Sequence, residues 1–226
     1  KKRFKTHKNL KFIEYKTNDT WARDCSALSV VDGETKKNLD FTFNGWGGKF
    51  EAKKDNAMTQ FLTPQAKKCD FILEGGAVES NGLDTILTTS KCMLNKNRNK
   101  NLSKSQITQK LKAYFGATNI IYLENGYLAG DDTDSHIDTL ARFVDAKTIM
   151  YIRCEDVEDE HFKELNMMEN ELKFIAKQYN FTLIPLPMSD AIYFKGERLP
   201  ATYANFLFLN KAVLVPIYEV KQDKKV

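Results

Sequence analysis

A short acidic segment near the middle of the chain has the composition of a reactive site. The segment GDDTDSHID (130–138) places His136, one of only three histidines, among four carboxylates. Imidazole carries a proton near neutral pH, and a neighbouring carboxylate raises its pKa. Acidic groups around such a proton carrier favour a cationic substrate. His136 and Asp138 are therefore candidate catalytic residues, although a lone histidine is more often a structural one.

Two further acidic motifs favour the same kind of substrate. WARD (21–24) ends in Asp24, and Trp21 supplies an apolar wall of the kind that a flat cation prefers. LEGG (73–76) contains Glu74, followed by two glycines that let the backbone approach a ligand closely.

Each of these motifs also has a purely structural interpretation. Arg23 and Asp24 could form an exposed ion pair with each other. Glu74 could pair with a buried arginine such as Arg142, and the glycines after it could permit a β-bulge.

The acidic segment also allows a metal site to be considered. Asp132, Asp134 and His136 alternate as the ligands of a calcium loop do, but neither the glycine at the sixth position nor the glutamate at the twelfth is present. Zinc would need more nitrogen or sulfur ligands than the segment groups together. We therefore predict no metal ion, and we include Asp132 among the candidate substrate-binding residues.

The elements that must position these residues recur with a period of about sixty residues. Each unit is predicted to contain a β-hairpin, an amphipathic helix and a further strand. In the best-defined unit, the turn at Asn81-Gly82 joins two hairpin strands, and Ser103 begins a helix with a capping-box sequence. The expected elements are a hairpin within 71–89, a helix from 103 and a strand at 119–123; a hairpin at 137–152, a helix at 158–179 and a strand at 181–186; a hairpin of 205–208 with 212–215; and a less regular copy within 24–61, with strands near 27–31 and 39–43.

The repeat has a consequence for the candidate site. Asp24, Glu74, His136 and Asn205 all fall near the start of the first hairpin strand of their units. If the units surround an axis, these positions converge on one pocket, and a shared ligand would compensate the cost of burying ionisable groups. On a strand, His136 and Asp138 would share one face. By contrast, we interpret Cys25 as a core residue and His161 as part of the polar flank of its helix, and Arg198 and Tyr203 as pocket rim or loop support.

Composition narrows the class of protein. The 226 residues can form a single domain, 1–226, and a net charge of +4 from 34 basic and 30 acidic residues does not call for nucleic acid. The basic opening (1–8) is interpreted as a solvated chain end, and no apolar run is long enough to span a bilayer. Four cysteines without paired spacing favour reduced thiols and a cytoplasmic protein. A homo-oligomer is compatible with the sequence.

Taken together, the motifs resemble the agmatine deiminase family, within the guanidino-group-modifying enzymes of the pentein fold. The resemblance covers about 12–218, and its most specific stretches are WARD (21–24), LEGG (73–76), LTTSKCMLN (87–95), GDDTDSHID (130–138) and RLPATY (198–203). It implies an α/β fold in which five ββαβ modules form a pseudo-fivefold propeller around a central pocket. About four of these five modules are expected in this chain.

The resemblance also implies an activity, the hydrolysis of agmatine to N-carbamoylputrescine and ammonia in a polyamine pathway, without a cofactor. His136 would be the general acid and base, and Asp24, Glu74 and Asp138 would bind the guanidinium group, with Trp21 nearby. Paired carboxylates suit a planar group that is always charged. In the implied mechanism, a cysteine thiolate attacks the guanidinium carbon and an amidino-thioether is then hydrolysed.

The chain departs from the family at two places. CSAL (25–28) stands where the family has Gly-Pro, and the glycine-rich His-Cys segment that carries the family's nucleophile is not found. We therefore expect an incomplete copy of a deiminase, lacking the family's opening segment and last module, that binds guanidinium weakly and is inactive alone. A deiminase of free or peptidyl arginine and a non-catalytic protein that binds polyamines or metal ions are the alternatives.

Overall fold

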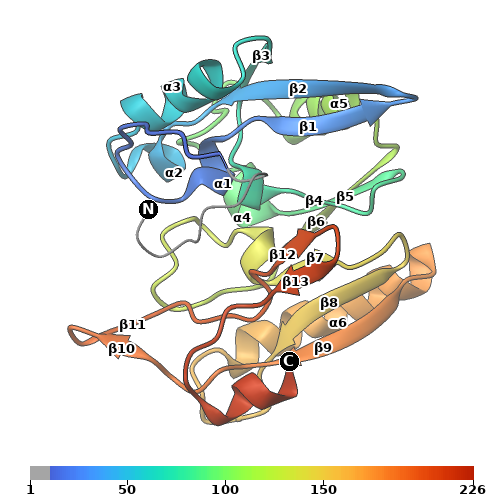
Figure 1. Ribbon diagram of the computed structural model, residues 1–226. Coiled ribbons are helices and arrows are strands. Elements are labelled where there is room, and N and C mark those ends of the chain that lie inside the picture. The colour runs from blue at the N-terminus through green and yellow to red at the C-terminus, as the bar shows by residue number, and fades with distance from the viewer. Residues whose placement is uncertain (1–10) are drawn as a thin grey trace.

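The computed structural model describes residues 11–226, and three of its sheets share one topology. Each sheet begins with an antiparallel hairpin, continues through a helix, and adds a third strand parallel to the second strand of the hairpin. Figure 1 shows the first sheet at the top, the second in the middle and the third at the bottom. The modules are β1 (Leu28–Asp32), β2 (Thr35–Thr42), α3 (Lys53–Leu62) and β3 (Lys67–Ile72); β4 (Glu79–Ser80), β5 (Thr85–Thr89), α5 (Lys104–Phe115) and β6 (Asn119–Leu123); and β7 (Ala141–Phe143), β8 (Thr148–Arg153), α6 (Phe162–Tyr179) and β9 (Thr182–Pro187).

Short elements connect these modules. They are the helices α1 (Ala22–Cys25), α2 (Gly45–Gly48) and α4 (Ser90–Met93), the 3-10 helices η1 (Gly75–Ala77), η2 (Ile137–Thr139) and η3 (Lys221–Lys225), and the hairpins of β10 (Tyr193–Phe194) with β11 (Glu197–Arg198) and of β12 (Leu207–Leu209) with β13 (Ala212–Leu214). The mixed α/β class is thus confirmed, and residues 11–226 contain three ββαβ modules and two further hairpins. Closure into five modules stays a prediction. The first copy is as regular as the others, because its hairpin, helix and third strand all form.

Two strand assignments from the sequence were wrong. Residues 71–72 end β3, which pairs in parallel with β2, whereas the strand that pairs with β5 is β4. An apolar run does not show which strand it will pair with, and here residues 71–72 extend the strand that pairs in parallel with β2. His136 and Asp138 also lie before β7 rather than on it, because residues 137–139 form η2.

Hydrogen bonds and backbone conformations near the helix ends determine where α5 and α6 begin and end. Ser103 and Gln106 form the predicted capping box of α5, and Gly116 ends the helix in the left-handed conformation with φ at 65°. Helix α6 begins at Phe162 rather than near 158, after a turn in which the Asp159 amide donates to the carbonyl of Asp156. Leu165, Met168 and Leu172 on its inner face are fully buried.

The apolar core leaves one polar region between the modules. One core cluster joins the third module to β5 and β6, and another joins β2 and β3 to α4 and α5. The short helix η1 contacts both α1 and η2 beside these clusters. In Figure 1 this region lies at the centre of the molecule, next to α4. The core therefore holds fixed the elements that carry the candidate motifs.

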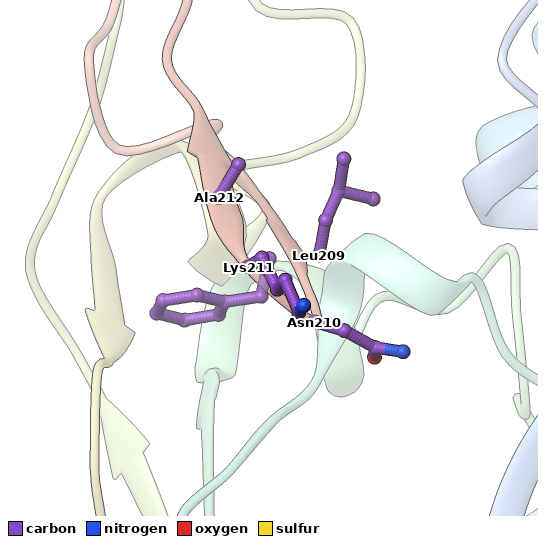
Figure 2. Close-up of a pocket in the computed structure, with 5 residues that line it drawn as sticks. Leu209, Asn210, Lys211 and Ala212 are labelled. Atoms are coloured by element: carbon purple, nitrogen blue, oxygen red, sulfur yellow. The ribbon is translucent and has the colours of Figure 1, made fainter.

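Several other expectations concern the surface and the cysteines. The basic opening (1–8) lies outside the described residues. No helix in the described part of the chain is both long enough and apolar enough to cross a bilayer. All four cysteines are free and buried, and Cys25 is a core residue as predicted. A shallow, open hollow of about 590 Å³ lies at the turn of the β12–β13 hairpin, where the side chains of Leu209 and Asn210 point away from the strands (Figure 2).

Candidate active site

The structure brings four of the predicted residues together. Nδ1 of His136 lies 3.7 Å from Oδ1 of Asp24 and 3.9 Å from Oδ1 of Asp138, and Nε2 lies 4.0 Å from Oε2 of Glu74. All four residues are buried, with exposed fractions between 0 and 9%. Asn205 is also present, because its amide contacts Asp138. The convergence inferred from the repeat is therefore observed.

The backbone of η1 holds Asp24 in place. The Gly76 amide donates to Oδ1 of Asp24 at 2.8 Å, and the Trp46 indole donates to Oδ2 at 2.9 Å. Gly75 lies so close to Arg23 that an added Cβ would be 2.2 Å from its carbonyl oxygen. Burial raises the pKa of Asp24, while His136 and the two hydrogen bonds oppose that rise. Asp24 is thus fixed in orientation, and the glycine pair permits close contacts with Arg23, His136 and Asp138, while close approach of this backbone to a ligand stays a prediction.

Replacing Gly76 by alanine is expected to disrupt the cluster. A Cβ at this position would lie 2.6 Å from Nδ1 of His136 and 2.9 Å from both Asp138 oxygens, so the imidazole must move. In the protein expressed from its gene, we expect the variant to lose at least about tenfold in kcat for the reaction proposed below, since catalysis is sensitive to displacements of about 1 Å. Gly116→Ala is the matched control, because its Cβ meets nothing within 4 Å and only its φ of 65° is unfavourable. Equal activity of the two variants would contradict this expectation.

Glu74 is held by an arginine that the sequence did not suggest. Nε of Arg98 donates to both Glu74 oxygens at 2.9 Å, and the two side chains are 1% and 0% exposed. Nη1 of Arg98 also donates to Asp134 at 2.7 Å, which connects Glu74 to the acidic segment. The predicted alternative partner, Arg142, instead binds Glu79 at 2.6 Å. The prediction that Glu74 pairs with a buried arginine was therefore correct, but the arginine is Arg98 and not Arg142.

Asp138 has one satisfied oxygen and one free oxygen. Nη1 of Arg23 donates to Oδ2 of Asp138 and to Oδ1 of Asn205, each at 2.6 Å. Oδ1 of Asp138 is buried and has no hydrogen-bond partner among residues 11–226. The expected alternative of a self-contained Arg23–Asp24 surface pair is wrong, because both side chains bind elsewhere. The free oxygen faces His136, where a donor from a ligand could reach it.

The surroundings of His136 favour its protonated form. Burial alone would lower the pKa of His136, but the carboxylate of Asp24, the sulfur of Cys92 and the carboxylate of Asp138 together raise it to about 10. These neighbours therefore favour the protonated form of the imidazole at neutral pH. The protonated imidazole would then be a proton donor beside the carboxylates of Asp24 and Asp138.

Two predicted site residues lie outside this cluster. The Trp21 side chain is 63% exposed, and the aromatic residue that contacts Asp24 is Trp46. Asp132 is exposed, and its backbone carbonyl accepts a hydrogen bond from the Lys49 ammonium group. No spacing in the sequence distinguishes Trp46 from Trp21, because Trp46 reaches the site through an unusual loop with its own φ at 53°.

Three residues regarded as peripheral prove to be structural supports. His161 is buried rather than on a polar flank, because Nε2 accepts from the Ala129 amide and Nδ1 contacts Asp159. Arg198 binds Asp159 and Glu160. Tyr203 is fully buried, and its hydroxyl donates to Asp223 at 2.6 Å.

One further group near the cluster has donor atoms of the kind that bind metal ions. A carboxylate oxygen of Glu74, the sulfur of Cys92 and a ring nitrogen of His136 lie within 4.8 Å of one another. Both Glu74 oxygens already accept from the Arg98 guanidinium, whose charge disfavours a cation at this position. The arrangement therefore suits a proton-transfer site better than a metal centre.

Comparisons with known proteins identify the family. The model of the Porphyromonas-type peptidyl-arginine deiminase family matches residues 1–226. A protein of Legionella pneumophila (strain Paris) named "Putative agmatine deiminase" is 34% identical over 218 residues, which are 93% of this chain and 63% of that protein. The chain thus spans less than two thirds of the length of this curated relative.

Solved structures show the same relationship. A cysteine-to-serine variant of the C. jejuni agmatine deiminase with substrate bound superposes with a TM-score of 0.91 at 50% identity, over 96% of this chain and 66% of that one. The agmatine deiminase of Enterococcus faecalis gives 0.84 at 27% identity, over 93% and 66%. The chain therefore belongs to the Porphyromonas-type peptidyl-arginine deiminase family, and its relatives include agmatine deiminases.

Proposed function

We propose that this chain forms the substrate-binding and acid–base part of an agmatine deiminase, which hydrolyses agmatine to N-carbamoylputrescine and ammonia. The observation that carries the proposal is the convergence of Asp24, Glu74, His136 and Asp138, from three separate parts of the chain, in one buried cluster. The agmatine deiminases among its relatives support the same activity. The product would serve the formation of putrescine.

Carboxylates in this arrangement suit a guanidinium group. Asp24 and Asp138 face the same side of His136, and the unpaired Oδ1 of Asp138 needs a hydrogen-bond donor. A bound guanidinium would supply planar N–H donors to both carboxylates, with each charge-assisted bond contributing about 1.5–3 kcal/mol. The central carbon would then be held in one orientation next to the imidazole.

His136 would supply and recover the protons of the reaction. After a thiolate adds to the guanidinium carbon, the C–N bond to the terminal nitrogen breaks, and the leaving ammonia takes a proton from the imidazolium. The neutral imidazole then accepts a proton from water as that water adds to the amidino-thioether carbon. Loss of the thiolate, with transfer of the remaining hydroxyl proton to the released ammonia or to solvent, gives the ureido product and restores the thiolate and the imidazolium. The raised pKa of His136, which favours the protonated ring at neutral pH, fits the first of these steps.

The four cysteines of this chain are poorly suited to the nucleophilic step. All are buried, and burial raises the pKa of the thiols of Cys25, Cys69, Cys92 and Cys154. We therefore assign the attacking thiolate to a cysteine outside these 226 residues, as the family resemblance implies. On this proposal the 226 residues alone bind the substrate weakly and release no ammonia.

A second candidate function is the deimination of free or peptidyl arginine, which the name of the matching family favours. Arginine differs from agmatine by a carboxylate, and a peptide differs by two amide bonds, so either substrate would profit from a nearby free cation. Arg23 is near the cluster and 32% exposed, but its charge is already paired with Asp138. That pairing makes agmatine the better candidate.

Kinetics with three substrates tests this proposal. We expect the protein expressed from its gene to show a kcat/KM for agmatine at least about 100-fold above those for L-arginine and a peptidyl arginine, because only agmatine avoids an unpaired carboxylate or amide. Ammonia and the ureido product should form in equal amounts. Preference for a peptidyl substrate would establish the second function. Binding of agmatine or putrescine without any turnover would favour a non-catalytic polyamine-binding protein.

A further inference from the structure

A buried thiol lies behind the candidate catalytic histidine. Cys92, in the short helix α4, is 0% exposed, and its sulfur lies within 4.8 Å of a ring nitrogen of His136 and of a carboxylate oxygen of Glu74. The reaction proposed above makes no use of this residue. Figure 1 places α4 in the middle of the molecule, among the elements that carry the site.

The two nitrogens of His136 have different surroundings. Nδ1 faces the carboxylates of Asp24 and Asp138, where the substrate is proposed to bind. Nε2 points to the other side, towards Glu74 at 4.0 Å, and it is buried without a hydrogen-bond partner among residues 11–226. A protonated ring carries a donor at Nε2 that needs an acceptor, because a buried unsatisfied donor is costly.

Glu74 cannot easily be that acceptor. Both of its oxygens are held at 2.9 Å by Nε of Arg98, whose own Nη1 is bound to Asp134. A shift of Glu74 towards His136 would break this buried ion pair. The sulfur of Cys92 lies within 4.8 Å of both groups and is a weak acceptor that could take this role.

Thr89, the last residue of β5, fixes Cys92 relative to His136. The Thr89 hydroxyl oxygen accepts from the Cys92 amide at 3.3 Å and caps α4, and the same hydroxyl donates to the Ser135 carbonyl at 2.7 Å. One side chain therefore ties the helix that carries the thiol to the residue just before His136. Because Thr89 bonds to both segments, it fixes the position of the Cys92 thiol relative to the His136 ring, as a positioning role for Cys92 requires.

We propose that Cys92 is a positioning residue for His136, whose sulfur supports the Nε2 side of the ring and keeps Nδ1 directed at the substrate carboxylates. The inference rests on the proposed deiminase function for its kinetic part only. Burial keeps this thiol protonated, which suits a neutral support and not a nucleophile. The other charged groups that face His136 or its neighbours keep their own hydrogen bonds or ion pairs in the arrangement proposed; they are Asp24, Glu74, Asp138, Arg98, Arg23 and Asp134.

The test measures His136 directly, by NMR titration of the imidazole carbons, together with the pH dependence of kcat for agmatine. Replacing Cys92 by alanine, or by valine to fill the space, removes the sulfur and is expected to lower the His136 midpoint by about one pH unit, because the charged ring loses its acceptor. We expect kcat to fall about tenfold with KM changed less than about threefold, and the alkaline limb of the kcat profile to move to lower pH. Cys92→Ser, which keeps a polar atom, should retain both the midpoint and kcat within about threefold.

Cys69→Ala is the matched control, because Cys69 is also a buried thiol but contacts the carbonyl of Lys67 and none of the site residues. It should lower the melting temperature without moving the His136 midpoint. Unchanged midpoints in the Cys92→Ala and Cys92→Val variants, with a melting temperature lowered as in the control, would show that Cys92 only fills space. Lack of activity in the unmutated protein would refute the proposed function instead, and the titration would still decide the role of Cys92.

Discussion

Replacing His136 by asparagine is expected to lower kcat for agmatine by about 10²–10⁴-fold, the usual contribution of a general acid and base. Asparagine keeps a polar side chain of similar size but cannot donate and recover a proton at the required pKa. KM should change much less, because the guanidinium contacts are assigned to Asp24 and Asp138. Steady-state release of ammonia from agmatine measures both parameters.

The control for this variant is His161→Gln. His161 is as buried as His136, but its ring supports the Ala129 amide and Asp159 rather than the cluster. It should cost stability and leave kcat within about fivefold, because glutamine can replace part of this hydrogen bonding. A His136→Asn enzyme that retained more than about a tenth of the activity would refute the proposed role of His136.

Replacing Arg98 by methionine is expected to lower the free energy of unfolding by about 3–5 kcal/mol, since it leaves the buried Glu74 carboxylate without its partner. Urea denaturation followed by tryptophan fluorescence measures this change. The double variant Glu74→Gln/Arg98→Met should recover part of the loss, because the remaining side chain then carries no charge.

Lys37→Met provides the matched control. Lys37 pairs with Asp32 at 2.6 Å, but both side chains are more than half exposed, at 53% and 73%. Removing that pair should change the free energy of unfolding by less than about 1 kcal/mol. Equal effects of the two methionine substitutions would mean that burial of the Glu74–Arg98 pair adds nothing to the fold.

Patterns within single elements could be recognised in the sequence. The capping box at Ser103 located α5, and the Asn-Gly turn signal at 81–82 indicated a hairpin there. These signals are local, because capping and turn formation depend on residues only a few positions apart. The repeat then placed Asp24, Glu74 and His136 at equivalent positions, and from that equivalence their convergence could be predicted.

Partners that meet across modules could not be predicted in the same way. Both Arg98 and Arg142 are compatible with an ion pair to Glu74 in sequence, and only the folded loop after α4 selects Arg98. Likewise, Trp46 reaches Asp24 through a turn with a left-handed backbone conformation, and we could not predict this conformation from the sequence. Parallel pairing of β3 with β2 is a further case, because a parallel partner lies across a connection and not across a turn.

The contacts of Arg23 bear on when the site can form during synthesis. Its guanidinium bonds to residues that follow it by 115 and 182 positions in the chain, at Asp138 and Asn205. A ribosome that has released only the first two modules thus carries Asp24 and Glu74 without the side chains that complete their surroundings. Nascent chains that end before Asn205 lack an acceptor for the Arg23 guanidinium, so the surroundings of Asp138 are complete only after three modules and the strand-free segment before β12 have been translated.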